Sequence, residues 1–574
     1  MERTSPDPPR IIQGDLVVAI ALAVVLGLIW AARNWAGLAA LRLPDTDDVM
    51  RLQQVRDWLG GQAWSDLVQH RLGMGTPMHW TRVADLGPAA MLTLASPLLG
   101  IHDAERLMVV TWPIMLFAAA LALVGRIARA LEPEASRTAM VIAAIAYPAT
   151  TIFAPGRIDH HGLQLVLLLA ATRVGIAMPT LRNGAILGGL AAVSLMVGLE
   201  TTPFFIVLGG ATILAWVLQP SIAGARMVGV GVGALTGLAV GIPLFASAQW
   251  RYPACDGFTA QAATGLAILA LVPLALGVAA PRLTTIRARS IATAMLSLAA
   301  FVIVRAQSPA CLSPYGQVPM PLRRLWLDHV GEAQSAFSAA PVVVVGYLGV
   351  MLAGLAASIW VARRYPGRIA GLLLALQVTA LLITLVQPRG AYSGAMLGAP
   401  ALAVMIGAAR RRGTGWVVAA WTVSAGMLYP LVGAACASAF GHAEAPSSVA
   451  DDAACATPAM MASLARLSPG VVMAPIDTGA WGIAATPHRF VAGPYHRNIE
   501  GNLAMYRFFL GDRGQAQRIA RRWGVRYVLY CDGTMGGVRP RPASLAQALT
   551  EGRAPGWLRP LDARRQPILF EVAR

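Results

Sequence analysis

Long apolar segments separated by short polar loops occupy residues 1–439, and the apolar segments contain almost no acidic residues. An α-helix needs about 20 apolar residues to cross a bilayer. The pattern predicts thirteen spanning helices, near 12–31, 107–127, 138–154, 163–180, 184–199, 204–219, 227–247, 262–280, 291–304, 341–362, 369–387, 394–409 and 415–439. We expect the first of them to remain as a span and not to be cleaved as a signal peptide.

Composition supports this interpretation. Hydrophobic residues make up 56% of the chain, charged residues 13%, and the mean hydropathy is +0.59, which excludes a soluble protein built around one core. The class is a polytopic α-helical membrane protein. The net charge of +18 comes from arginines in loops that the positive-inside rule assigns to the cytoplasm, so we predict no nucleic-acid partner.

The arginines also set the predicted orientation. With the N-terminus in the cytoplasm, an odd number of spans delivers the chain after residue 440 to the outside, in the periplasm of a bacterium whose inner membrane holds the protein. Residues 440–574 are polar and alternate strand-like runs, at 470–476 and 527–530, with helical runs, at 460–467 and 515–523. This segment is predicted to be a periplasmic α/β domain following a membrane domain at 1–439.

All five cysteines fall outside the membrane or at the end of the last span in this topology, and they are Cys255, Cys311, Cys436, Cys455 and Cys531. An oxidising compartment permits disulfides, but the sequence leaves the pairing open.

The first outer loop, 42–102, begins with three acids, Asp45, Asp47 and Asp48. Apolar residues follow at near-helical spacing and predict a short amphipathic helix that starts at the acids. One interpretation is that these acids cap the helix, most plainly Asp45; the other is that Asp47 and Asp48 carry chemistry.

The second outer loop, 155–162, contains Asp159, His160 and His161 immediately before a span. A carboxylate and an imidazole at this spacing suit one divalent ion, and polar residues at a membrane boundary are an equally good explanation. The fifth outer loop, 305–340, contains Glu332 in the run Val-Gly-Glu-Ala-Gln, which would be unremarkable by itself.

Taken in order, these motifs resemble a known family. An Asp-Asp helix in the first outer loop, Asp-His-His in the second, Val-x-Glu-x-Gln in the fifth, thirteen spans and an outer α/β domain are similar to the catalytic subunit of oligosaccharyltransferases, above all its archaeal form, and to the wider GT-C glycosyltransferase superfamily. The resemblance implies a GT-C fold with catalytic loops at 42–102, 155–162, 305–340 and 388–393.

The resemblance also implies roles for individual residues. Asp47 matches a catalytic, metal-binding aspartate, with Asp48 beside it as a further catalytic candidate; Asp159 and His161 match metal ligands, and Glu332 matches a catalytic glutamate. The implied cofactor is a divalent metal, Mn or Mg, which transfer to a hydroxyl does not strictly require.

In the outer loop 388–393, Arg389 resembles the family arginine near the donor phosphates, with Tyr392 close by in the sequence. An arginine that anchors the loop at the membrane surface is an equal alternative.

The chain departs from the family where a Trp-Trp-Asp-Tyr-Gly motif reads the acceptor sequon. Here the run 473–479 is Met-Ala-Pro-Ile-Asp-Thr-Gly, which keeps Asp477 but has no tryptophan. The expected acceptor is therefore a glycan, a lipid or another envelope hydroxyl in preference to a protein asparagine. Polar residues that follow are candidates for donor or acceptor binding, or ordinary loop residues, and they are His488, Tyr495, His496 and Arg497.

The sequence thus predicts a glycosyltransferase that uses a sugar linked to polyprenyl phosphate or pyrophosphate within the membrane lipid. A transporter or lipid flippase is an alternative, but such proteins usually carry ionisable residues near mid-membrane. A non-catalytic partner in envelope assembly is a third possibility that the altered motif allows.

Overall fold

The computed structural model describes residues 9–309, 311, 315–337, 339–439, 455–532, 538, 540–562 and 568–573. The chain divides into two compact units. We call the first the helical unit; it comprises Met1–Arg42, Trp80–Leu312 and Gln334–Gly441. We call the second the sheet unit; it comprises Leu43–His79, Ser313–Ala333 and His442–Arg574.

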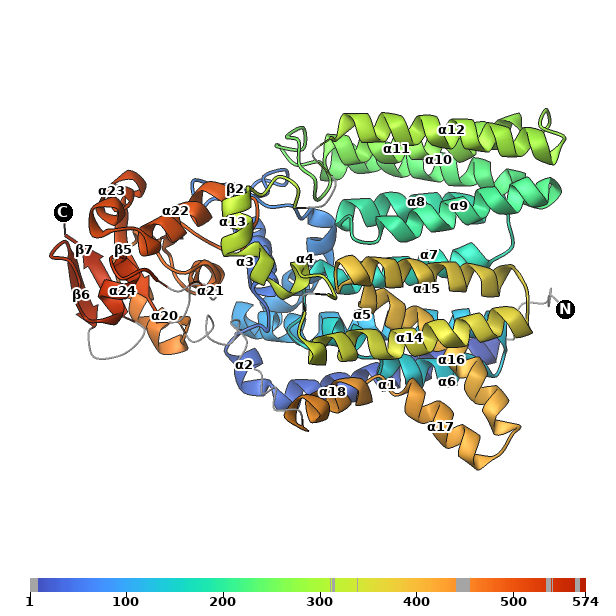
Figure 1. Ribbon diagram of the computed structural model, residues 1–574, viewed down its shortest axis with the longest axis horizontal. Helices are drawn as coiled ribbons and strands as arrows, with labels where there is room; N and C mark the ends of the chain where they lie inside the picture. Colours follow the sequence, from blue (N-terminus) through green and yellow to red (C-terminus); the bar gives the residue numbers. More distant parts are fainter. Residues whose placement is uncertain are drawn as a thin grey trace. The chain divides into compact units, whose positions relative to one another are not determined.

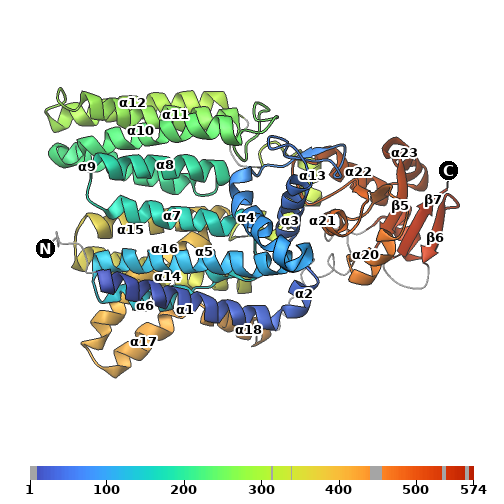
Figure 2. The same ribbon diagram turned by 180° about the vertical axis from the view of Figure 1, so that it is seen from behind.

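Most helices of the helical unit run side by side (Figure 1; Figure 2). In chain order its elements are α1 (Pro9–Arg33), α2 (Trp35–Ala39), α4 (Arg82–Leu99), α5 (Ile101–Leu131), α6 (Ala135–Ala144), the 3-10 helix η1 (Ala149–Phe153), α7 (His160–Ile176), α8 (Leu181–Val197), α9 (Thr202–Leu218), α10 (Pro220–Phe245), α11 (Ala260–Ala279), α12 (Ile286–Gln307), α14 (Pro341–Arg364), α15 (Arg368–Val386), α16 (Gly390–Arg410), α17 (Thr414–Ser424) and α18 (Leu428–Ala439).

The chain is a multi-pass membrane protein, and each of the thirteen predicted segments falls on a helix or helix pair. Among the described residues, eight helices are long and apolar enough to cross a bilayer, or nine if α17 and α18, which are bent by 77°, form one span. The difference from thirteen arises because α7, α8 and α9 have only 17 residues each and because α6 ends at Ala144. The count of thirteen crossings stays a prediction.

Small residues let α8 and α10 approach closely. A Cβ atom on Gly184 or Gly188 of α8 would collide with backbone atoms of Arg226 and Val230 on α10. Close backbone contact through small residues is the usual way for membrane helices to associate, because burial in lipid offers little hydrophobic gain.

Helix α7 is fixed at its C-terminal end by two arginines. Arg226 of α10 donates to the carbonyl oxygens of Val174 (2.9 Å) and Ala177 (3.2 Å), and Arg368 donates to Ala177 at 3.1 Å. The last carbonyls of a helix have no partner within it and carry partial negative charge, so these guanidinium groups satisfy them. The opposite end of α7 carries the Asp-His-His motif.

The sheet unit contains a mixed five-stranded sheet in the order β4-β3-β5-β7-β6. Strand β3 (Val471–Met473) is parallel to β4 (Arg489–Phe490) and β5 (Val525–Tyr530), and β7 (Ile568–Val572) is antiparallel to β5 and β6 (Leu558–Asp562). Its further elements are α3 (Thr46–Leu59), β1 (Val68–Gln69), β2 (Thr76–Pro77), α13 (Met320–Leu325), η2 (Leu327–His329), η3 (Gly331–Ala333), α20 (Pro458–Ala465), α21 (Ile476–Ala485), α22 (Ile499–Leu510), α23 (Arg513–Trp523) and α24 (Leu545–Thr550).

Two segments that precede residue 440, Leu43–His79 and Ser313–Ala333, also belong to the sheet unit. The sequence did not indicate this. The segment at Leu72 extends the sheet beyond β4: Phe490 donates its N–H to the Arg71 carbonyl, and Gly73 donates to the Phe490 carbonyl, both at 2.8 Å. Gly73 has a positive φ of 57°, which disfavours side chains, and a Cβ there would meet Asn498. The segment 313–333, from the predicted fifth outer loop, joins the same core through Leu322 and Leu327.

The predicted helix of the first loop is confirmed as α3, which packs against α21. Its residues from Asp48 to Val55 are all buried, so the expected amphipathic character is absent over this stretch. The strands and helices expected in the C-terminal segment correspond to β3, β5, α20 and α23.

The structure contains two disulfides, which give the cysteine pairing that the sequence left open. Cys255 is bonded to Cys311 within the helical unit, and Cys455 to Cys531 within the sheet unit, whereas Cys436 is free and exposed.

We expect replacement of both Cys455 and Cys531 by serine to destabilise the sheet unit by about 2–4 kcal/mol, because the bond closes a long loop that the unfolded chain otherwise explores freely. Urea titration of the full chain, followed by protease sensitivity after α20, measures the effect. Cys436→Ser is the matched control and should change stability by less than about 0.5 kcal/mol. Equal stability of the double variant and the control would contradict the prediction.

Candidate metal and catalytic site

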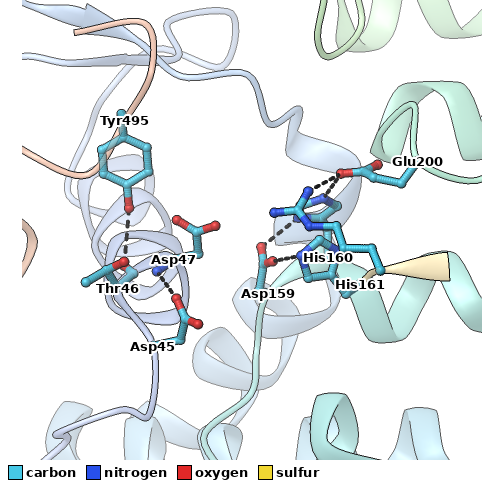
Figure 3. A network of polar contacts seen from close by, with 9 residues as sticks. Asp45, Thr46, Asp47, Asp159, His160, His161, Glu200 and Tyr495 are labelled. Atoms are coloured by element: carbon cyan, nitrogen blue, oxygen red, sulfur yellow. Dashed lines mark hydrogen bonds and ion pairs between the residues drawn. The ribbon is translucent and has the colours of Figure 1, made fainter. Parts of the chain in front are cut away.

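Three ionisable side chains lie together at the start of α7. Asp159 occupies the N-cap position of the helix, and His160 and His161 form its first turn. All three are buried, and their ligand atoms lie within 4.8 Å of one another. An N-cap aspartate usually accepts a hydrogen bond from the first turn of its own helix. Asp159 makes no such bond, and its carboxylate faces the two histidines instead (Figure 3).

His160 is held between two carboxylates. Its Nδ1 lies 2.6 Å from Asp159 Oδ1 and its Nε2 lies 2.9 Å from Glu200 Oε1 (Figure 3). An ionised carboxylate can only accept, so an imidazole with a carboxylate on each nitrogen must donate from both. The ring of Trp80, itself fully buried, lies 6.4 Å from the ring of His160.

Glu200 comes from the link between α8 and α9, outside both helices. Arg389, at the N-cap of α16, lies 3.6 Å from Glu200 Oε1. Burial raises the pKa of the Glu200 carboxyl, but the charge and hydrogen bond of His160, aided by His161 and Arg389, outweigh burial and hold this pKa well below its ordinary value. Glu200 is therefore a carboxylate that bridges two cationic side chains.

Of the three grouped residues, Asp159 and His161 are suited to bind a divalent ion. Both nitrogens of His160 are engaged by carboxylates, whereas His161 Nε2 lies 3.3 Å from Asp159 Oδ2. An imidazole beside a carboxylate suits Mn²⁺ better than Mg²⁺, which prefers oxygen ligands alone. Two protein ligands leave most positions of such an ion to other groups.

The other predicted catalytic acids belong to the sheet unit. Asp45 caps α3 by accepting the Asp47 N–H at 3.0 Å, so the capping interpretation holds for this residue. Asp47 is half-buried in the first turn, and Asp48 is fully buried. Glu332 lies in η3, but its side chain is outside the part of the chain that the structure describes. The convergence of Asp47 and Glu332 with Asp159 stays a prediction.

Some of the predicted donor- or acceptor-binding residues lie against the first loop within the sheet unit. The buried Tyr495 donates its hydroxyl to the Thr46 carbonyl at 3.2 Å (Figure 3). The ring of His496 lies 5.5 Å from that of His79, and Arg497 donates to the Met78 carbonyl at 3.3 Å.

His488 has a different environment. It is fully buried, its Nδ1 accepts from the Gly470 N–H, and its Nε2 faces the Leu464 carbonyl at 2.8 Å. Both ring nitrogens are used to join β3, α20 and β4, which is a structural role, and we leave His488 out of the proposed site.

In the segment 473–479, Asp477 is half-buried in the first turn of α21. Gly479 is explained by packing, since a Cβ there would collide with the Ala492 carbonyl. In the helical unit, the ring of Tyr392 lies 6.1 Å from that of Tyr347.

Sequence reasoning gave no role to Glu200, His160 or Trp80. The only signal for Glu200 was its place as a lone acid between two apolar runs, and its partners come from segments far away in the chain.

No protein-family model matches the chain, and no curated protein matches it in sequence. Its fold is nevertheless similar to that of the oligosaccharyltransferase of Archaeoglobus fulgidus. The apo form has a TM-score of 0.62 at 13% identity, over 91% of this chain and 69% of that chain.

Two further structures of that enzyme show the same similarity of fold. The one in complex with an inhibitory peptide and a dolichol-phosphate has a TM-score of 0.60 at 14% identity, over 89% of this chain and 69% of that chain. The complex with Zn and sulfate has a TM-score of 0.56 at 14% identity, over 88% and 67% of the respective chains. The resemblance predicted from the motifs is thus confirmed as a likeness of fold.

We expect the purified chain to bind one Mn²⁺ and the Asp159→Ala and His161→Ala variants to lose at least about tenfold in affinity, because each removes one ligand atom from the ion. Titration followed by the electron paramagnetic resonance signal of free Mn²⁺ measures this. Glu132→Gln is a suitable control, since Glu132 pairs with Arg411 and lies in the link between α5 and α6. Unchanged affinity in both ligand variants would disprove the assignment.

Proposed function

We propose that the chain is a metal-assisted membrane glycosyltransferase of the GT-C type, which transfers a sugar or oligosaccharide from a polyprenyl phosphate or pyrophosphate to an extracytoplasmic acceptor. The observation that carries the proposal is the buried Asp159–His161 pair at one end of α7, within a fold like that of an oligosaccharyltransferase. Solved structures of that similar enzyme hold Zn and sulfate in one case and a dolichol-phosphate in another.

The chemistry assigns a task to each group. Departure of the donor lipid leaves negative charge on a phosphate, which a divalent ion held by Asp47, Asp159 and His161 offsets when bound. Arg389 supplies a second, permanent positive charge and can bind phosphate through two N–H groups. Asp47, Asp48 and Glu332 are the acids that orient or deprotonate the acceptor.

The proposed location follows from the donor. A polyprenyl-linked sugar keeps its lipid in the bilayer and presents its anomeric carbon at the surface, so loops at the ends of spans are the natural place for the site. We propose thirteen crossings of a bacterial inner membrane, a cytoplasmic N-terminus and a periplasmic segment 440–574.

The proposed acceptor is a glycan, lipid or other hydroxyl. The similar enzyme has been solved with a tethered acceptor peptide that contains the sequon NVT. This chain lacks tryptophans between Met473 and Gly479, so it lacks the apolar walls that would make such a pocket selective. Asp477, Tyr495, His496 and Arg497 in the sheet unit, with Tyr392 in the helical unit, are the residues that we propose for donor or acceptor binding.

We expect Asp47→Ala to lower the transfer rate at least about 100-fold, because it removes both a metal ligand and an acceptor-orienting carboxylate. The assay follows consumption of lipid-linked sugars extracted from source cells, with purified protein in liposomes. Asp103→Asn is the control; Asp103 is an exposed acid that pairs with Arg106, and its variant should retain full activity.

The same assay separates the alternatives. Loss of activity on addition of a chelator, with recovery on Mn²⁺, supports a metal-assisted enzyme. Movement of the lipid-linked sugar across the bilayer without cleavage would instead identify a transporter or flippase, and neither cleavage nor movement would indicate a non-catalytic partner. Full activity in Asp47→Ala would refute the proposed mechanism.

The proposal also requires Asp47 and His161 to share one ion. We expect cysteines at these two positions, in a Cys436→Ser background, to be joined efficiently by a short bifunctional maleimide. Mobility on denaturing gels after cleavage between the two positions reports the link. The control pair carries cysteines at 132 and 161, since α5 separates Glu132 from the end that holds the motif. Equal yields from both pairs would show that the acids do not converge.

A further inference from the structure

The carboxylate of Asp159 is oriented by a chain of two further side chains. Glu200 Oε1 accepts from His160 Nε2 at 2.9 Å, and His160 Nδ1 donates to Asp159 Oδ1 at 2.6 Å. One oxygen of Asp159 is thereby used, and the other, Oδ2, faces His161 Nε2 at 3.3 Å. The hydrogen bonds from Glu200 through His160 therefore determine which oxygen of Asp159 faces His161.

The contact between Asp159 and His160 is buried. The side chains of Asp159 and His160 are 3% and 2% exposed. A buried hydrogen bond between charged groups is strong, and losing one member leaves the other without compensation. Asp159 makes no side-chain capping bond to its helix, and its carboxylate is directed to the two histidines.

Glu200 is itself held in place by close packing. A Cβ atom on Gly198, two residues earlier, would lie 2.6 Å from Gln164 Nε2 and closer still to Glu200 Oε2. An alanine at this position would require the Glu200 carboxylate and the Gln164 amide to shift. Since Gln164 lies one turn along α7 from His160, the link between α8 and α9 is fitted against the helix that carries the motif.

We propose that Glu200 is a positioning residue that acts through His160 to fix the Asp159 carboxylate for metal binding. The inference rests on the proposed function, because it assumes that Asp159 and His161 ligate the ion. Groups that hydrogen-bond to metal ligands typically change metal affinity by about 10–100-fold when they are removed. Glu200→Ala therefore weakens Mn²⁺ binding by about 10–100-fold although Glu200 does not touch the ion.

The experiment is a Mn²⁺ titration of the purified full-length protein, read by the electron paramagnetic resonance signal of the free ion. Glu200→Gln keeps an oxygen that accepts from His160 and should retain affinity within about threefold of the wild type. Gly198→Ala removes no functional group but requires the Glu200 carboxylate to shift, and should weaken Mn²⁺ binding in the same direction as Glu200→Ala. Glu132→Gln, remote from the motif, should bind like the wild type.

A double variant tests whether Glu200 acts through His160. If Glu200 acts only through His160, Glu200→Ala in a His160→Ala background causes no further loss of affinity, because the two residues act as one unit. Thermal unfolding of each variant is measured in parallel. A general loss of stability would lower the melting temperature without this non-additive pattern in Mn²⁺ affinity.

The possible outcomes distinguish a missing metal site from a missing role of Glu200. If the wild type binds no Mn²⁺, the metal site of the proposed function is refuted together with this inference. If the wild type binds and Glu200→Ala binds equally well, only the role of Glu200 is refuted. Equal weakness of Glu200→Gln and Glu200→Ala, or additive losses in the double variant, would likewise overturn the positioning role.

Discussion

The contact of one imidazole with two carboxylates is the interaction on which the candidate site depends. His160 joins Asp159 to Glu200, and Glu200 in turn approaches Arg389. Charges removed from water are stable only when they are paired and hydrogen-bonded, and loss of one partner from a buried pair costs about 3–5 kcal/mol. The four side chains therefore have to be considered together, and they tie the start of α7 to the α8–α9 link and to the start of α16.

The contacts among these four side chains require α7 to be held in place, and both ends of α7 are restrained. At the far end, Arg226 and Arg368 satisfy the last carbonyl groups. Their positive charges also suit the negative end of the helix dipole, while its positive end lies at the motif, where carboxylates are favoured. A helix restrained in this way can hold Asp159 and His161 at a constant separation, which a metal site requires.

Much of the helical unit could be predicted because lipid imposes a simple rule on composition. Apolar runs of sufficient length must become helices, so all thirteen predicted segments fall on helical elements. The Asp-His-His motif was found for a related reason, since ionisable residues at the ends of apolar runs are conspicuous. Glu200 was not assigned a role, because its partners His160 and Arg389 lie 40 and 189 residues away in the sequence and the periodicity of one helix carries no information about another.

The sheet unit was predicted less completely for a physical reason of a different kind. A strand pairing is defined by backbone hydrogen bonds, so the segment at Leu72 could join the edge of β4 without any distinctive side-chain pattern. The same applies to the segment 313–333, which contributes Leu322 and Leu327 to the core of this unit. As a result, the first-loop acids, the η3 segment and the segment 473–479 are parts of one folded body. A change in the segment 473–479 can therefore be accommodated within the sheet unit, while Asp159, His160 and Glu200 in the helical unit keep their mutual contacts. If the proposed function holds, this separation would allow one fold to retain the chemistry of a lipid-linked donor and to differ in the acceptor.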